Sequence, residues 1–206
     1  MKNTSKNLYK MVLTAIFAAV IMVMAFVPWL GFINLIIISA TLIHIPVIIG
    51  SIILGPKYGM FLGFIFGLSS FLNATFNPGI TSFLFSPFYP GGNIFSLVIC
   101  FLPRMLVGIV PYYVYKGIRL VLKKGGKEVI ALGVAGIVGA MTNTLLVMNL
   151  VYVLFADEFA MARGVAVDAV YGVIVTVIVA NGIPEAIVAA ILTAGVGKVL
   201  LKIKNI

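Results

Sequence analysis

Long apolar blocks, separated by short clusters of polar residues, proline and glycine, dominate the pattern of this chain. A straight helix needs roughly 20 apolar residues to cross a bilayer, and hydropathy together with the helix breakers divides the chain into six predicted helices. They cover residues 8–27, 42–54, 58–72, 94–121, 129–155 and 165–201. The pattern therefore predicts an all-α membrane protein of six transmembrane helices, forming a single integral membrane domain over residues 1–206. The second helix is shorter than a straight span, so we expect it to be tilted or packed inside the protein.

Two segments between these helices are too irregular for a helix and too apolar for a freely solvated loop. Residues 29–41 are apolar but include a glycine and an asparagine, and residues 73–93 hold three prolines, three glycines, three asparagines and five aromatic residues. Proline and glycine oppose a regular helix. Loops of this kind are often lids or binding loops, although an interfacial loop without a ligand has the same composition. We expect both loops to be ordered.

Composition indicates that the chain lies in a lipid bilayer, and the placement of its charges indicates how it is oriented there. Hydrophobic residues make up 63% of the 206 residues and charged residues 9%, too few polar groups to cover a soluble fold. The net charge is +9, but an N-terminus inside the cell puts 12 of the 14 basic residues on the cytoplasmic side, in keeping with the positive-inside rule. These twelve are Lys2, Lys6, Lys10, Lys57, Lys116, Arg119, Lys123, Lys124, Lys127, Lys198, Lys202 and Lys204. We therefore expect a multi-pass cell-membrane protein with both termini in the cytoplasm and both loops outside, and no nucleic-acid partner.

Arg104 is a basic residue inside a predicted helix. It lies about ten residues into the fourth helix, roughly 15 Å by helical rise. A charge at that depth is costly and must face protein or water. A guanidinium there suits a carboxylate or phosphate ligand, which it grips with two parallel hydrogen bonds. The other interpretation is a structural ion pair with Glu185 or Asp168.

Several polar residues recur in the fifth and sixth helices. Asn143 and Asn149 belong to the fifth helix, and Asn181 and Tyr171 to the sixth. Amides inside a membrane usually form hydrogen bonds between helices, so each alone could serve packing. Together with Arg104 they form a polar set on three helices, which indicates a pocket.

The sequence contains few groups that could carry catalysis. His44 is the single histidine and Cys100 the single cysteine, so neither a zinc site nor an internal disulfide is expected. We interpret His44 as either a ligand contact or a structural hydrogen-bonding residue. No Walker motif is present, so this chain is not expected to bind ATP. We expect a transport subunit rather than an enzyme.

Two stretches of the chain resemble a known family. These are TAIFAAV, with its AxxxA in the first helix, and HIPVIIGSIILGPKYGMFLGFIFGLSSFL. They resemble the substrate-binding S component of energy-coupling factor (ECF) vitamin transporters, over essentially the whole chain. The motifs HIPVIIG and ITSFLFSPF and the Pro–Arg pair of FLPRMLVG look like the pantothenate-specific group.

The resemblance implies a pocket in the outer half of helices four to six, capped by the loops 29–41 and 73–93. Phe85, Ser86 and Asn93 of the second loop then become candidates for contact with the vitamin. Ala15 and Ala19 would lie on the face that docks with a transmembrane T component, and two partner ATPases would bind the ATP. Riboflavin or another water-soluble vitamin is the alternative substrate. A stand-alone permease or a membrane structural subunit is the alternative class of protein.

Overall fold

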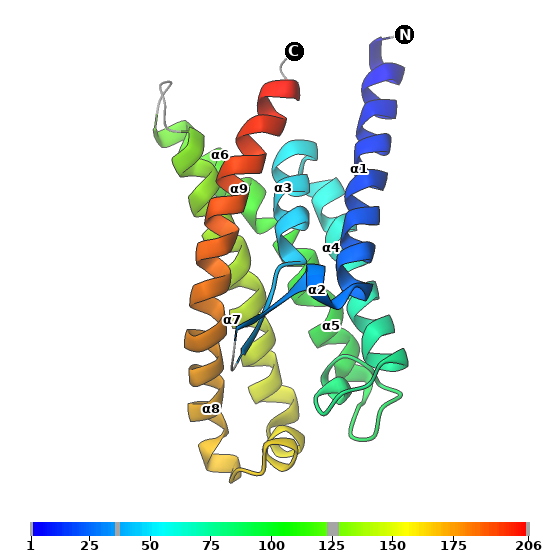
Figure 1. Ribbon diagram of the computed structural model, residues 1–206, viewed down its shortest axis with the longest axis vertical. Helices are drawn as coiled ribbons and strands as arrows, with labels where there is room; N and C mark the ends of the chain where they lie inside the picture. The colour runs from blue at the N-terminus through cyan, green and yellow to red at the C-terminus, as the bar shows by residue number, and fades with distance from the viewer. Residues whose placement is uncertain (1, 36–37, 123–127, 205–206) are drawn as a thin grey trace.

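The computed structural model describes residues 2–35, 38–122 and 128–204, which form an elongated bundle of helices (Figure 1). The first helix, α1 (Lys2–Phe26), and the last, α9 (Ile183–Lys204), bring both termini to the same end of the bundle, where α6 (Val110–Val121) also ends. The opposite end carries the turn between α7 (Glu128–Arg163) and α8 (Val170–Val177).

The predicted number and order of apolar helices are confirmed among the described residues. Five stretches are long and apolar enough to cross a membrane: Asn7–Phe26, Pro56–Phe76, Ile94–Val121, Glu128–Arg163 and Val167–Ile203. The sixth, α3 (His44–Leu54), is shorter, and all of its residues are buried. It therefore lies inside the bundle, one of the two arrangements expected for so short a helix.

Two of the long stretches are interrupted. The stretch Ile94–Val121 consists of α5 (Ile94–Val107) and α6, which are joined through Gly108, whose N–H donates to the carbonyls of Arg104 and Met105. The last passes from α8 into α9 through a π-helical turn, η3 (Ile178–Gly182). Pro184 follows this turn and has no N–H to donate to the carbonyl four residues earlier, which favours a local departure from α-helical hydrogen bonding.

The segment 29–41 contains regular structure that the sequence did not predict. After the short helix α2 (Pro28–Gly31), strands β1 (Phe32–Leu35) and β2 (Ile38–Thr41) pair antiparallel, with Phe32 opposite Thr41. The Leu42 N–H donates to the Gly31 carbonyl at 2.9 Å and closes the base of this hairpin. A backbone packed against a helical bundle must pair its own polar groups, so the all-α prediction holds for the spans while this connection is a β-hairpin.

The connection 77–93 contains one turn of 3₁₀ helix, η1 (Ser82–Leu84), and several hydrogen bonds that tie it to the bundle. The Ser96 hydroxyl donates to the Phe83 carbonyl at 2.6 Å, and Ser86 and Thr75 share a hydrogen bond of 2.8 Å. Asn93 caps α5, because its side chain accepts from the Phe95 N–H. These bonds hold the connection against the ends of α4 (Pro56–Phe76) and α5.

Glycines bring α4 unusually close to α5. A methyl group on Gly59 would clash with the Gly108 carbonyl, and one on Gly63 with the Arg104 carbonyl. The third glycine of this stripe, Gly67, lies against Cys100 and Phe101. Without side chains the two backbones approach closely, as in small-residue helix pairs within membranes. This close packing places Arg104 beside α4.

Candidate ligand-binding site

Arg104, in the last turn of α5, is buried and only 6% exposed. One terminal nitrogen, Nη1, donates to the Ile99 carbonyl at 2.8 Å, while Nε is buried without a hydrogen-bond partner among the described residues. The guanidinium carbon lies 4.8 Å from the ring centroid of Phe85 and 5.4 Å from that of Phe66. Two aromatic rings therefore stabilise the cation, while part of its hydrogen-bonding capacity remains unused.

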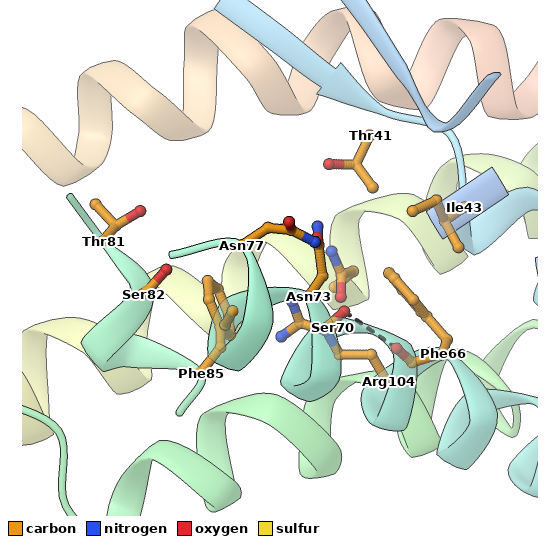
Figure 2. A pocket seen from close by; sticks show the side chains of 12 residues that line it. Thr41, Ile43, Phe66, Ser70, Asn73, Asn77, Thr81, Ser82, Phe85 and Arg104 are labelled. Carbon is orange, nitrogen blue, oxygen red and sulfur yellow. Dashed lines mark hydrogen bonds between the residues drawn. The ribbon is translucent and has the colours of Figure 1, made fainter. Parts of the chain in front are cut away.

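A cavity of about 220 Å³ opens beside Arg104. Figure 2 shows side chains of α4 and of the connection 77–93 around it, with Thr41 and Ile43 contributed by the end of the hairpin and the residues that follow it. The lining is Thr41, Ile43, Phe66, Ser70, Asn73, Ala74, Asn77, Thr81, Ser82, Phe85, Arg104 and Asn143. Apart from Arg104, the polar groups here are uncharged amides and hydroxyls.

A second cavity, of about 140 Å³, adjoins the first because four residues line both: Thr41, Phe85, Arg104 and Asn143. Its other side is formed by α7 and by the last predicted helix. The remaining lining is Thr144, Val147, Met148, Val177, Asn181 and Glu185. The two cavities together surround one buried guanidinium with polar groups from four helices and the hairpin.

Two of the predicted amides lie at these cavities. Asn143, on α7, is buried, and its Oδ1 has no hydrogen-bond partner among the described residues. A buried carbonyl without a partner is costly, so this atom is a candidate acceptor for a ligand N–H or O–H. Asn181 comes from the π-helical turn η3. Such turns are often found at functional sites.

Glu185, also buried, lines the second cavity from the first turn of α9. Its Oε1 accepts the Thr41 N–H at 2.7 Å, and its Oε2 accepts the Thr144 hydroxyl at 3.0 Å. Among the described residues Arg104 has no carboxylate within the 4.0 Å of an ion pair, and Asp168 lies exposed in η2 (Val167–Ala169). Neither structural pairing considered from the sequence is present in this structure.

The structure places the other predicted site residues away from the cavity walls. Asn149 is exposed and donates to the Leu145 carbonyl of its own helix. Tyr171 is 56% exposed and packs against Tyr152. His44 is fully buried at the start of α3, with neither ring nitrogen hydrogen-bonded among the described residues.

Ser86 and Asn93 have roles within the connection 77–93: Ser86 bonds to Thr75, and Asn93 caps α5. Of the three candidates in this connection, Phe85 alone lines the cavities, through its contact with Arg104.

The sequence interpretation missed the α4 side of the first cavity. Ser70, Asn73 and Asn77 all line it, and the Asn77 side chain donates to Asn73 Oδ1 at 3.1 Å. Their spacing of three and four residues puts them on one face of a helix. This polar stripe at the end of an apolar block was the available signal, but residues 73–77 were assigned to the loop.

The two small residues of the AxxxA motif, Ala15 and Ala19, are exposed on α1. Ala15 lines a groove between α1 and the start of α4, together with Met11, Thr14, Ala18, Lys57, Tyr58 and Phe61. This face is therefore open to lipid or to another protein and is separate from the cavities around Arg104.

Comparisons with known proteins give a consistent result. The sequence model of the family described as "ECF transporter, substrate-specific component" matches residues 9–197. A protein of Lactococcus lactis subsp. cremoris called pantothenic acid transporter PanT is 36% identical over 173 residues, which cover 82% of this chain and 81% of the relative. The pantothenate transporter PanT of Leuconostoc mesenteroides is 32% identical over 198 residues, covering 94% and 92%.

Proposed function

This chain belongs to the family of substrate-specific components of ECF transporters, and we propose that it binds pantothenate in the two cavities around Arg104. The observation that carries this proposal is the buried guanidinium of Arg104, which forms no ion pair with a carboxylate among the described residues. A buried cation without a counter-ion is strongly unfavourable. A ligand carboxylate would supply the missing charge and accept hydrogen bonds from it.

Pantothenate matches the other groups around Arg104. It has one carboxylate, a central amide and two hydroxyls, joined by apolar segments. Asn143, Asn73 and Ser70 offer both donors and acceptors, while Phe66 and Phe85 give apolar contact. Mostly apolar walls with a few placed polar groups are typical of small-molecule sites. The names of the two relatives support this vitamin over others.

We further propose how the chain is oriented in the membrane and which proteins it assembles with. The basic residues favour cytoplasmic termini, which puts the connection 77–93 on the outer side and the cavities open to substrate from outside. A T component would dock on the exposed α1 face that carries Ala15 and Ala19. Two partner ATPases would bind ATP and supply the energy, and this chain would have no enzymatic activity or cofactor of its own.

Two measurements test this function. The first is mass spectrometry of the small molecule that is released when the purified chain is denatured, and the second is a calorimetric titration of the chain with pantothenate. We expect pantothenate to be recovered and Arg104→Ala to lose about 2–5 kcal/mol of binding free energy, the usual cost of removing one partner of a buried charge pair. Arg163→Ala is the matched control, because Arg163 lies in the last turn of α7, outside both cavities. Recovery of riboflavin, or unchanged affinity in Arg104→Ala, would refute the proposal.

A further inference from the structure

The two cavities differ in charge. Among the described lining residues of the first cavity, Arg104 is the one charged group. The second cavity is also lined by Glu185, whose carboxylate is held by the Thr41 N–H and the Thr144 hydroxyl and forms no ion pair with Arg104. A ligand that reaches both cavities therefore meets a cation with neutral donors on one side and an anion on the other.

This asymmetry orients a ligand with a single carboxylate. The carboxylate is favoured on the first-cavity side of Arg104, where Ser70 and Asn73 are neutral donors. In the second cavity it would be repelled by Glu185, because like charges at close range in a low-dielectric site disfavour each other strongly. The uncharged end of the ligand then lies in the second cavity.

Glu185 still has capacity to bind that uncharged end. A carboxylate has about four acceptor positions, and two of them are occupied by Thr41 and Thr144. The remaining positions can accept hydrogen bonds from hydroxyl groups of a ligand. The two protein donors fix the orientation of the carboxylate, so that it is already in place when the ligand enters.

We infer that Glu185 is a specificity-determining residue: it accepts the hydroxyl end of the substrate and excludes molecules that carry a second negative charge at that end. The inference rests on the proposed binding of pantothenate. It predicts that pantothenate phosphorylated on its terminal hydroxyl is rejected, although it retains the carboxylate that Arg104 would bind. A transporter with this site takes up the free vitamin and not its phosphate ester.

Calorimetric titration of the full chain in detergent tests the inference, with pantothenate and its phosphate ester as ligands. We expect the wild type to bind pantothenate about a hundredfold or more tightly than the phosphate ester. Glu185→Gln keeps the size of the side chain and one acceptor oxygen, and we expect it to reduce this ratio of affinities by at least about tenfold. Asp168→Asn is the control, because it removes one negative charge from an exposed position outside the cavities. Its ratio should match that of the wild type.

A second measurement uses the wild-type chain alone and does not depend on the folding of the variant. The acetyl ester of the terminal hydroxyl adds bulk without charge, so it should bind more tightly than the phosphate ester. Equal exclusion of both esters, or an unchanged ratio in folded Glu185→Gln, would overturn the role of Glu185 while leaving pantothenate binding intact. Failure of the wild type to bind pantothenate would instead refute the proposed function.

Discussion

At the scale of a single residue, the planar shape of the guanidinium group is central to the proposed role of Arg104 in ligand binding. The carbon atom of this group lies over the rings of Phe66 and Phe85, one nitrogen donates to the Ile99 carbonyl, and Nε is buried without a hydrogen-bond partner among the described residues. A flat group can stack on aromatic rings and donate in the plane at the same time, whereas a lysine ammonium is a compact, strongly hydrated charge. We therefore expect that a positive charge alone is not sufficient for ligand binding at this position.

Arg104→Lys tests this point. The substitution keeps the positive charge but loses the planar donors, so we expect pantothenate binding to weaken by about 1.5–3 kcal/mol, the value of a hydrogen bond to a charged group. The measurement is a calorimetric titration, with the thermal unfolding midpoint in detergent as the control for folding. Wild-type affinity in Arg104→Lys would mean that Arg104 acts through charge alone.

At the scale of elements, the site depends on the contact between α4 and α5. The glycines of α4 allow the two backbones to touch, and this contact brings Ser70 and Asn73 to the same cavity as Arg104. The site also depends on the contact between the hairpin and α9, since the N–H of Thr41 at the end of the hairpin donates to Glu185 of α9. Residues far apart in the sequence thus form one wall only if these helices keep their spacing.

Gly63→Ala should separate α4 from α5. The added methyl would clash with the Arg104 carbonyl, and overpacking of this kind costs about 1–3 kcal/mol. We expect a lower thermal unfolding midpoint and weaker pantothenate binding, because the backbone of Arg104 must move. Gly117→Ala on α6 is the matched control: nothing lies within 4 Å of its new methyl group. Equal stability and affinity of the two variants would contradict the role assigned to the glycine contact.

At the scale of the whole molecule, the two ends of the bundle have different characters. One end carries both termini and the end of α6, and the other carries the connection 77–93 and the turn after α7 (Figure 1). Lysines concentrate near the first end, and the cavities are lined by residues of the connection 77–93. By the positive-inside rule we expect the termini in the cytoplasm, which would give the cavities access from outside.

Labelling of introduced cysteines in intact cells tests this orientation. The native Cys100 is buried and gives little background. Gly79 is exposed in the connection 77–93, and nothing lies within 4 Å of a side chain added there. We expect a membrane-impermeant maleimide to label Gly79→Cys in intact cells and Lys198→Cys only after permeabilisation. The reverse pattern would show that the chain is inserted in the opposite direction.

The sequence by itself determined the apolar spans, their order and the presence of Arg104 within them. These features depend on local composition, because about 20 apolar residues in a row are stable in a bilayer whatever their neighbours are. The sequence predicted unbroken helices over residues 94–121 and 165–201, and the interruptions at Gly108 and before Pro184 appeared only in the structure. The hairpin was missed, since its strands are stabilised by pairing with each other rather than by a strong local pattern.

Only the tertiary structure decided which polar residues meet. Asn143 and Asn149 have similar surroundings in the sequence, yet they point about 120° apart around α7 by helical geometry, and of the two Asn143 alone lines the cavities. The interior of a membrane protein and the lipid are both apolar, so hydropathy does not say which face of a helix turns inward. That choice follows from close packing between helices, and it also brings Thr41 to Glu185, 144 residues later in the chain.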